Sequence, residues 1–535
     1  MASESKSPIN MLDLDEVLDS IGVGKYHVLQ ALLLAGPSIA EGSEMLVASS
    51  ILGALEASWG ISPAMKGVMM SIVFVGVLFG GLVGGAWADS VGRCPVILAA
   101  YVGILLFGGL TALTWGPRSM LVCRFFFGMA YGAGCGPIVA LLLECAPSKA
   151  RAHLVNLGNL WFAIGEVYSA LLLFMLMPSL GDYTGYQWRY VTALAIVPAL
   201  VLLPGALCLL QESPHYLTTK GRHEDAIAAV RYIASLNNTE ARGLFQEAAL
   251  EATDQRFILN DAGNDGGQEE KQMTLSERLE FLAGPQLLMI VVGGGYLCFF
   301  ANFMVFGLNY SLPQIFTQMG DQVHPTKQLL MSAICDIPGY LLAFFCISSR
   351  SYGHRDSLLV NAICVCVLQL VIASCDVYGL QNWTMVVLPC AYLSKYFVSC
   401  FFALSYIYLG EVFPSSCRCT ALAVCISMGR VGSMFSPIAY EALRASSRES
   451  AKNTSYFCLN AALSALAVLA IRWCLRYELK GRPLGTVPET FARRNSAPAR
   501  LMDQAVAAAK SRASASAPVR SSHGVLLSNK YGAMA

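Results

Sequence analysis

Residues 144–151 read ECAPSKAR and residues 411–418 read EVFPSSCR, and both stretches fit the pattern E-x-x-P-x-x-x-R. The second copy begins 267 residues after the first. Another pair keeps nearly the same register: GAWADSVGRCP (85–95) and RSYGHR (350–355) align on their glycines at an offset of 261 residues. One such match arises easily by chance, but two in register indicate an internal duplication. We therefore expect two similar halves.

The composition places the chain in a membrane. Of its 535 residues, 55% are hydrophobic and only 13% are charged, with a mean hydropathy of +0.54. Soluble globular proteins carry about 25% charged residues. The net charge of +1 argues against nucleic acid as a partner. Most of the 18 cysteines lie in apolar stretches without metal-binding or redox spacing, so we expect no metal and no cofactor. The polar, acidic N-terminus does not resemble a signal peptide.

Twelve stretches are each long and apolar enough to span a bilayer, which takes about 20 residues. They lie near 27–52, 65–88, 95–116, 119–143, 153–177, 188–210, 285–310, 327–348, 357–378, 383–409, 418–441 and 455–476. We therefore expect an all-α membrane protein of two parallel six-helix halves, with a solute site between them near the midplane. The expected divisions are an N-terminus (1–26), one half (27–210), a loop (211–284), the other half (285–476) and a mostly disordered tail (477–535).

Lysine and arginine are concentrated in the loops that join even to odd spans, in the central loop and in the tail. Since basic loops stay on the cytoplasmic side, both termini and the central loop should be cytoplasmic. Asn382 and Asn453, both in N-x-T/S patterns, would then lie outside as acceptors for glycosylation.

Several motifs resemble those of the major facilitator superfamily. Gly85-x-x-x-Asp89-x-x-Gly92-Arg93 resembles the signature between its second and third spans, although Cys94 replaces a basic residue. QESPHYLTTKGRHEDA (211–226) and YELKGRPL (477–484) resemble the sugar-porter motifs after spans 6 and 12. With the paired E-x-x-P-x-x-x-R, the resemblance covers about Leu14 to Leu484, and it implies a twelve-span carrier fold.

A closer resemblance is to the synaptic-vesicle-2-related group, which lies near carriers of organic cations and anions. It rests on the stretches VLDSIGVGKY (17–26), SIVFVGVLFGG (71–81), MPSLG (177–181), CDIPG (335–339) and MGRVGSMFSPI (428–438). This resemblance implies secondary transport of a small organic solute, at the plasma membrane or in an intracellular vesicle membrane. The alternative is a binding or trafficking protein that has a transporter fold but does not transport.

The cytoplasmic motifs place opposite charges at helix ends on one side of the membrane. The family resemblance implies a cytoplasmic gate that ties the two halves together when the inner side is shut. Its members are Asp89, Arg93, Glu144, Arg151, Glu212, Glu411, Arg418 and Glu478. An exposed ion pair contributes only about 0–1 kcal/mol, which suits a contact that must break in each cycle.

Seven ionisable residues lie deep inside the expected spans: Glu41, Glu44, Arg124, Glu166, Asp336, Lys395 and Arg430. Even on a lenient scale, each would cost about 2.5–3.5 kcal/mol if it faced lipid. We therefore expect them to face a wet cavity or one another.

Three roles remain open for these charges. Glu41 or Glu44 can pair with Arg124 and couple proton entry to solute entry, as in the proton-coupled sugar porters that the chain resembles. The acids can instead bind a solute cation directly, or the charges can be structural pairs. The predicted proton-coupling residues are Glu41, Glu44 and Arg124.

The predicted substrate-binding residues are Glu166, Asp336, Lys395, Arg430 and Asn159. Arg430 has small neighbours, so it can clamp a carboxylate or serve as a counter-ion to Asp336 or Glu166. Asn159 stands where sugar porters carry a glutamine, which counts against a hexose. Asp336 precedes Pro338-Gly339, which should break span 8 locally. The sequence thus predicts a monomeric carrier of a small organic ion rather than an enzyme.

Overall fold

A computed structural model describes residues 11–178, 180, 187–237, 258–260, 282–319, 324–349, 353–378, 383–413, 418–446 and 453–475. The expected disordered tail (477–535) and Asn382 lie outside these residues.

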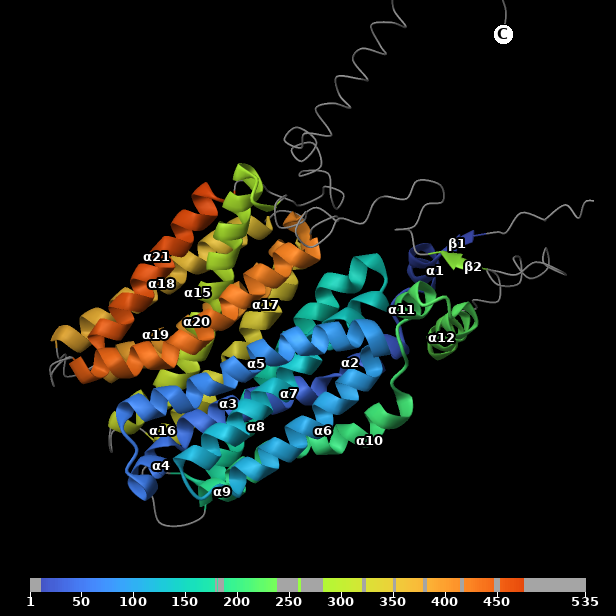
Figure 1. Ribbon diagram of the computed structural model, residues 1–535. Helices are drawn as coiled ribbons and strands as arrows, with labels where there is room; N and C mark the ends of the chain where they lie inside the picture. Colours follow the sequence, from blue (N-terminus) through green and yellow to red (C-terminus); the bar gives the residue numbers. More distant parts are fainter. Residues whose placement is uncertain are drawn as a thin grey trace, which may run out of the picture.

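One group of helices comes from the first part of the chain and is blue to green in Figure 1. It comprises α2 (Lys25–Leu33), α3 (Ala35–Ser50), α4 (Leu52–Trp59), α5 (Pro63–Val91), α6 (Arg93–Ala112), α7 (Pro117–Glu144), α8 (Arg151–Leu176), α9 (Gln187–Ala195) and α10 (Val197–Leu209). We call this group the N-half.

The second group, green-yellow to red in Figure 1, is called the C-half. It comprises α15 (Pro285–Gln318), α16 (Pro325–Ile334), α17 (Asp336–Ser348), α18 (His354–Tyr378), α19 (Trp383–Val412), α20 (Arg418–Ser446) and α21 (Thr454–Trp473). The halves meet where α5 packs on α20, α8 on α16 and α17, and α3 on α15. Ser71 Oγ of α5, for example, donates to the Met434 carbonyl of α20 at 2.6 Å.

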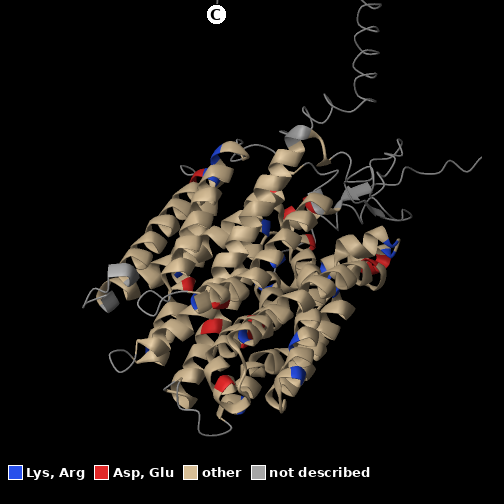
Figure 2. Cartoon of the chain, turned by 60° about the vertical axis from the view of Figure 1, so that its left-hand side comes forward, with Lys and Arg blue, Asp and Glu red and all other residues tan. Residues whose placement is uncertain are grey.

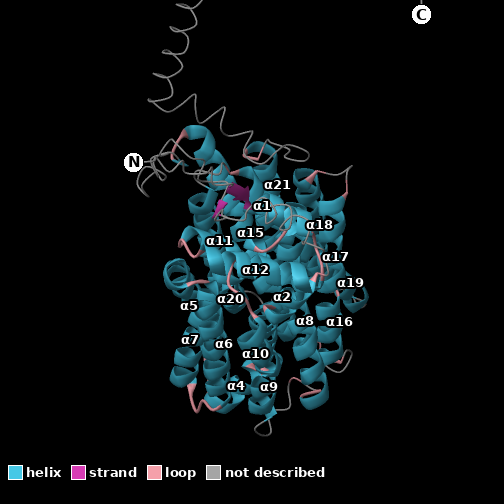
Figure 3. Cartoon of the chain, turned by 90° about the vertical axis from the view of Figure 1, so that its right-hand side faces the viewer, coloured by secondary structure: helices cyan, strands magenta, loops and turns pink. Residues whose placement is uncertain are grey.

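The helices confirm the expected fold class. In the part of the chain that the structure describes, 11 helices are long and apolar enough to cross a membrane, and 12 if the bent pair α2–α3 is one span. The long helices run side by side in Figure 3. Two elements were not predicted: the short strands β1 (Met11–Asp13) and β2 (Ile258–Asn260), which pair in parallel.

These strands lie with α1 (Leu14–Ile21), α11 (Pro214–Thr219) and α12 (His223–Leu236) at one end of the N-half, which we call the α12 end (Figure 1). α1 buries Leu14, Val17 and Leu18. Asn237, which follows α12, accepts from the Tyr26 backbone N–H at 2.9 Å and donates to the Gly22 carbonyl at 3.1 Å. The segment before the first span is therefore held against the loop between the halves.

The first span is bent by 41° between α2 and α3, where the sequence predicts one continuous helix. Pro37 has no N–H to donate to the carbonyl of Leu33, four residues earlier. The Tyr101 hydroxyl of α6 donates to that carbonyl instead, and it accepts from the Gly36 N–H at 3.2 Å. A neighbouring helix thus supplies the hydrogen bonds that the bend removes.

The sixth span shows the same arrangement at Ile196, between α9 and α10. Pro198 cannot donate to the Leu194 carbonyl, which accepts from the Tyr168 hydroxyl of α8 at 2.9 Å. In span 8, the interruption falls at Cys335, just before Asp336 and one turn upstream of Pro338-Gly339. The expected break is thus present but small, since Pro325–Ser348 still counts as one span.

Candidate functional site

Charged residues are sparse along the helices, and a few lie within the bundle (Figure 2). The first internal group is an ion pair inside the N-half. Arg124 Nη2 of α7 lies 3.2 Å from Glu44 Oε1 of α3, and the side chains are 3% and 1% exposed. Arg124 Nη1 also contacts Met70 Sδ at 3.8 Å. Of the two acids expected to pair with Arg124, Glu44 makes the contact, and its Oε2 has no hydrogen-bond partner among the described residues.

The second group joins the two halves. Lys395 Nζ of α19 lies 3.0 Å from Glu166 Oε2 of α8 and 2.5 Å from Asp336 Oδ2 of α17. Ser399 Oγ donates to Asp336 Oδ1 at 2.5 Å, and the Asn309 amide of α15 donates to Glu166 Oε1. All three charged side chains are buried. We call Glu166, Asp336 and Lys395 the interface triad.

The third group surrounds Glu41, one helical turn before Glu44. The Glu41 carboxylate lies near the Tyr131 hydroxyl of α7 and interacts electrostatically with Arg430 of α20, which makes no direct ion pair with it. Arg430 Nη2 contacts Cys135 Sγ of α7 at 4.0 Å. Glu41 Oε1 is buried and has no hydrogen-bond partner among the described residues. Arg430 therefore faces Glu41, and Lys395 serves as the counter-ion of Asp336 and Glu166.

Four of the predicted gate residues meet at the α12 end of the N-half. Arg93 Nη2 lies 3.0 Å from Glu144 Oε1, and Arg93 Nη1 lies 3.6 Å from Asp89 Oδ1. The Glu212 carboxylate accepts from the backbone N–H groups of Arg93 and Cys94, at 3.0 Å each. These contacts join spans 2, 3 and 4 to the loop after span 6.

Two more of the predicted gate residues have partners that the sequence did not reveal. Arg151 Nη2 pairs with Asp15 Oδ1 of α1 at 2.6 Å, and Glu411 Oε2 lies 3.1 Å from His354 Nδ1. The side chain of Arg418 and all of Glu478 lie outside the described residues. Each of these ion pairs joins residues of one half or of a segment attached to it. The predicted role of the cytoplasmic gate, which is to hold the two halves together, therefore stays a prediction.

Sequence reasoning missed several polar residues of these groups. Tyr131, Asn309 and Ser399 are uncharged, and no spacing pattern separates them from other polar residues of the spans. Glu441 is the last residue of the expected span 418–441, yet it is 4% exposed and accepts from the Tyr310 hydroxyl at 2.6 Å. Asn159 is half-buried on α8, two turns before Glu166.

Two buried aromatic residues of the C-half, Phe306 and Tyr440, have different surroundings. Phe306 is buried between the halves, with its ring 4.6 Å from that of Phe74 and 6.0 Å from that of Phe162. Tyr440 is also buried, and its hydroxyl donates to Asn453 Oδ1 at 3.2 Å. Asn453 is 7% exposed, which disfavours its glycosylation.

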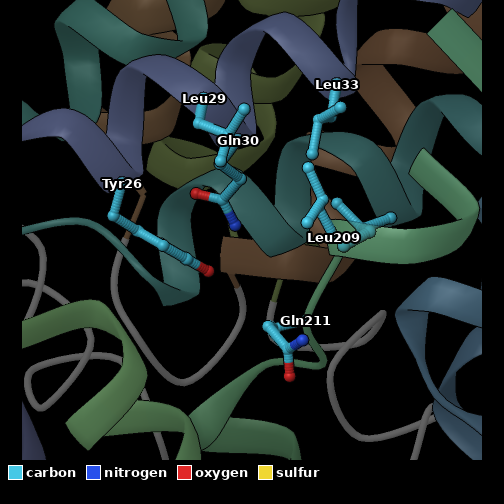
Figure 4. Close-up of a pocket in the computed structure, with 7 residues that line it drawn as sticks. Tyr26, Leu29, Gln30, Leu33, Leu209 and Gln211 are labelled. Carbon is cyan, nitrogen blue, oxygen red and sulfur yellow. The ribbon is translucent and has the colours of Figure 1, made fainter. Parts of the chain in front are cut away.

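A small pocket lies between α2 and α10, away from these charges (Figure 4). Its lining residues are Tyr26, Leu29, Gln30, Leu33, Leu209, Leu210 and Gln211. All of them belong to one half or the chain directly after it, so this pocket is not the predicted site between the halves.

Comparison with known proteins decides the family. The profile of the family described as "Sugar (and other) transporter" matches residues 39–491, which is most of the chain. The chain belongs to this family. Its members are transporters rather than enzymes, so the protein is a multi-pass membrane transporter.

Two similar proteins indicate the branch. The chain is 24% identical to organic cation/carnitine transporter 7 of Arabidopsis thaliana, over 79% of this chain and 87% of that protein. It is 26% identical to the synaptic vesicle 2-related protein of Bos taurus, over 88% of this chain and 82% of that protein. The resemblance that the motifs predicted is confirmed.

Solved structures confirm the fold. The proton:xylose symporter XylE bound to 6-bromo-6-deoxy-D-glucose matches with a TM-score of 0.65 at 19% identity, over 86% of this chain and 98% of that one. The partially occluded inward-open XylE of E. coli gives a TM-score of 0.64 at 18% identity. The chain therefore has the major facilitator fold.

Proposed function

We propose that the protein is a secondary active carrier that moves a small organic ion by alternating access of its two halves. The observation that carries this proposal is the ion pair between Glu166 of the N-half and Lys395 of the C-half. Glu166 lies about 22 Å along α8 from its first residue, Arg151, deep in a core about 30 Å thick. A buried pair that bridges two rigid groups must break when they separate, so it is suited to a moving interface.

The second part of the proposal assigns proton coupling to Glu44 and Arg124. This pair lies within the N-half, so separation of the halves leaves it intact. An unpartnered carboxylate oxygen is costly to bury as part of an anion, and binding a proton removes that charge. The buried Glu44 Oε2 and the nearby Glu41 Oε1 are both of this kind. A proton taken up here changes the charge that faces the interface.

The proposed solute is an organic ion rather than a sugar. The interface triad places three formal charges where the halves meet, and Arg430 of the C-half, which contacts Cys135 of the N-half, adds a fourth. Neutral hydroxyl groups do not neutralise such charges, whereas an ion does. The similarity to a protein named as an organic cation/carnitine transporter supports the same class.

The test is uptake into proteoliposomes with an imposed pH gradient, from pools of organic cations, carboxylates and sugars. The parent is compared with Glu44→Gln and with Glu224→Gln, which changes an exposed carboxylate on α12. We expect gradient-driven uptake of an organic ion in the parent and in Glu224→Gln. Glu44→Gln should lose the response to the gradient and keep solute exchange.

Two results would contradict separate parts of the proposal. Uptake by the parent that ignores the pH gradient would refute proton coupling and leave the carrier intact. No uptake from any pool, by protein that is shown to be folded, would refute the carrier mechanism itself.

We also propose that both termini face the cytoplasm, because the basic loops lie on the side of the N-terminus and of α12. Protease added outside sealed cells should then leave a C-terminal epitope tag intact. Cleavage of the tag without permeabilisation would reverse the orientation.

A further inference from the structure

Glu166 belongs to the N-half, but both of its oxygens are bound by the C-half. Oε1 accepts from the Asn309 amide of α15, and Oε2 lies 3.0 Å from Lys395 Nζ of α19. The side chain is 1% exposed. Any movement that separates the halves at this depth removes both partners at once. Glu166 is then left as a bare carboxylate on the wall of the opened space.

Lys395 and Asp336 behave differently, because both belong to the C-half. Their ion pair of 2.5 Å and the hydrogen bond from Ser399 to Asp336 stay together when the halves separate. Lys395 therefore has a partner in either state, whereas Glu166 has these partners only when the halves are closed.

The triad is one positive charge short of neutrality. Glu166 and Asp336 contribute two negative charges, and Lys395 contributes one positive charge. The other buried lysine and arginine side chains of the described residues have other partners: Arg124 pairs with Glu44, Lys66 pairs with Glu56, and Arg430 faces Glu41. A bound cation would complete two neutral pairs, one on Glu166 and the other between Lys395 and Asp336.

We propose that Glu166 binds the ammonium group of an organic cation, and that Lys395 is an internal substitute that occupies this carboxylate when the carrier is empty. This inference rests on the proposed function, since it requires the halves to move apart. In the empty carrier, Lys395 is shared between both acids and lets the halves close. In the loaded carrier, the ammonium group of the solute pairs with Glu166, while Lys395 stays paired with Asp336.

The surroundings define the solute further. Phe162 lies one turn before Glu166 on α8, and Phe306 lies one turn before Asn309 on α15. Their rings are 6.0 Å apart and span the interface beside the triad. An aromatic or alkyl group attached to the ammonium would lie against this pair, where rings also favour a nearby cation. The substrate class is therefore a primary or secondary amine with an apolar body.

The test measures binding to the full-length protein in lipid nanodiscs by calorimetry. The probes are phenethylammonium, phenethyl alcohol and phenylacetate, which share one carbon skeleton and differ in charge. We expect the parent to bind the ammonium in preference to the other two. Glu166→Gln should weaken ammonium binding by about tenfold or more, and the exposed control Glu224→Gln should leave it unchanged.

The decisive variant is Lys395→Gln. It removes the internal competitor and leaves both carboxylates, so affinity for the ammonium should rise by about tenfold or more. A lysine with a purely structural role would give a loss instead. Because two unpaired buried carboxylates can prevent folding, Lys395→Gln/Asp336→Asn provides a second variant that keeps Glu166 without a competitor. It too should bind the ammonium more tightly than the parent.

The outcomes separate this inference from the proposed function. Gradient-driven uptake of a carboxylate or a sugar, with no ammonium binding, would overturn the inference and leave the carrier proposal standing. Weaker ammonium binding in the folded double variant would show that Lys395 does not compete for Glu166. If no solute from any pool were taken up in the uptake assay, the carrier proposal itself would be refuted, and with it the inference that rests on it.

Discussion

Arg124 Nη2 lies 3.2 Å from Glu44 Oε1, and this buried ion pair is contained entirely within the N-half. The Glu166–Lys395 pair is equally buried but crosses to the C-half. Relative motion of the halves therefore breaks the second pair and preserves the first. This difference is the reason for proposing proton binding at Glu44 and solute binding at Glu166.

Arg124→Met should destabilise the protein strongly, because it leaves the Glu44 carboxylate buried without its counter-ion. Breaking one partner of a buried pair costs about 3–5 kcal/mol. Glu44→Gln/Arg124→Met removes both charges and should recover most of that loss. The free energy of unfolding, measured by titration with denaturing detergent, tests both variants. A double variant as unstable as Arg124→Met would show that the loss does not come from the unpaired acid.

Tyr101→Phe should destabilise the bent first span. The Tyr101 hydroxyl donates to the Leu33 carbonyl and accepts from the Gly36 N–H, and both groups lie next to the bend at Pro37. Leaving buried backbone groups unsatisfied costs about 1–3 kcal/mol each. In a Pro37→Ala background, the new N–H can donate to the Leu33 carbonyl, so Tyr101→Phe should cost less there.

A double-mutant cycle on thermal stability measures this coupling. Equal costs of Tyr101→Phe in the two backgrounds would mean that the tyrosine does not substitute for the missing proline N–H. Tyr168 and Pro198 offer an independent repeat, since the Tyr168 hydroxyl donates to the Leu194 carbonyl.

The helix bends near Pro37 and Pro198 show which features of the fold the sequence does not predict. Hydropathy predicts the number and length of the spans, since each must cross about 30 Å of hydrocarbon. The motifs predict the family, and the profile match confirms it. A proline predicts a local loss of a hydrogen bond, but not which side chain replaces it. That partner comes from another helix, so only the packed structure reveals Tyr101.

The same reasoning applies to the charged residues. Depth in a span predicts that Glu44, Arg124 and Glu166 need partners, because an unpaired charge in hydrocarbon is costly. It does not predict which acid meets which base. Arg430 was expected to clamp a carboxylate or to be a counter-ion of Asp336 or Glu166. Lys395 is the counter-ion of those two acids, and Arg430 faces Glu41. Helix rotation within the bundle decides between such pairings, and no motif in the chain encodes it directly.

Gly128→Ala and Gly136→Ala, both on α7, should differ sharply in their effects. A Cβ at position 128 would lie 2.0 Å from the Val73 carbonyl oxygen of α5, so the two helices must move apart. A Cβ at position 136 meets nothing within 4 Å apart from its chain neighbours. Gly136→Ala should therefore change stability by no more than about 1 kcal/mol, because the helix propensity of alanine opposes its contact with Pro137, the next residue.

Melting temperatures of the purified variants test this contrast. We expect Gly128→Ala to melt well below the parent and Gly136→Ala close to it. A normal melting temperature for Gly128→Ala would mean that α5 and α7 are less closely packed than the structure shows.

Glu212→Ala should loosen the start of α6. The first N–H groups of a helix have no partner within that helix, and Gly92 before α6 has no side chain to cap them. The Glu212 carboxylate accepts from two of these groups, on Arg93 and Cys94, at 3.0 Å each. Loss of such a cap costs about 0.5–2 kcal/mol.

Glu212→Gln keeps one carbonyl oxygen and should lose less stability than Glu212→Ala. The exposed Glu224→Ala serves as the control. Thermal unfolding measures the order of stability, and limited proteolysis should show faster cleavage near residue 212 in Glu212→Ala alone. If Glu212→Ala and Glu224→Ala were equally stable and equally resistant, the carboxylate would not be capping α6.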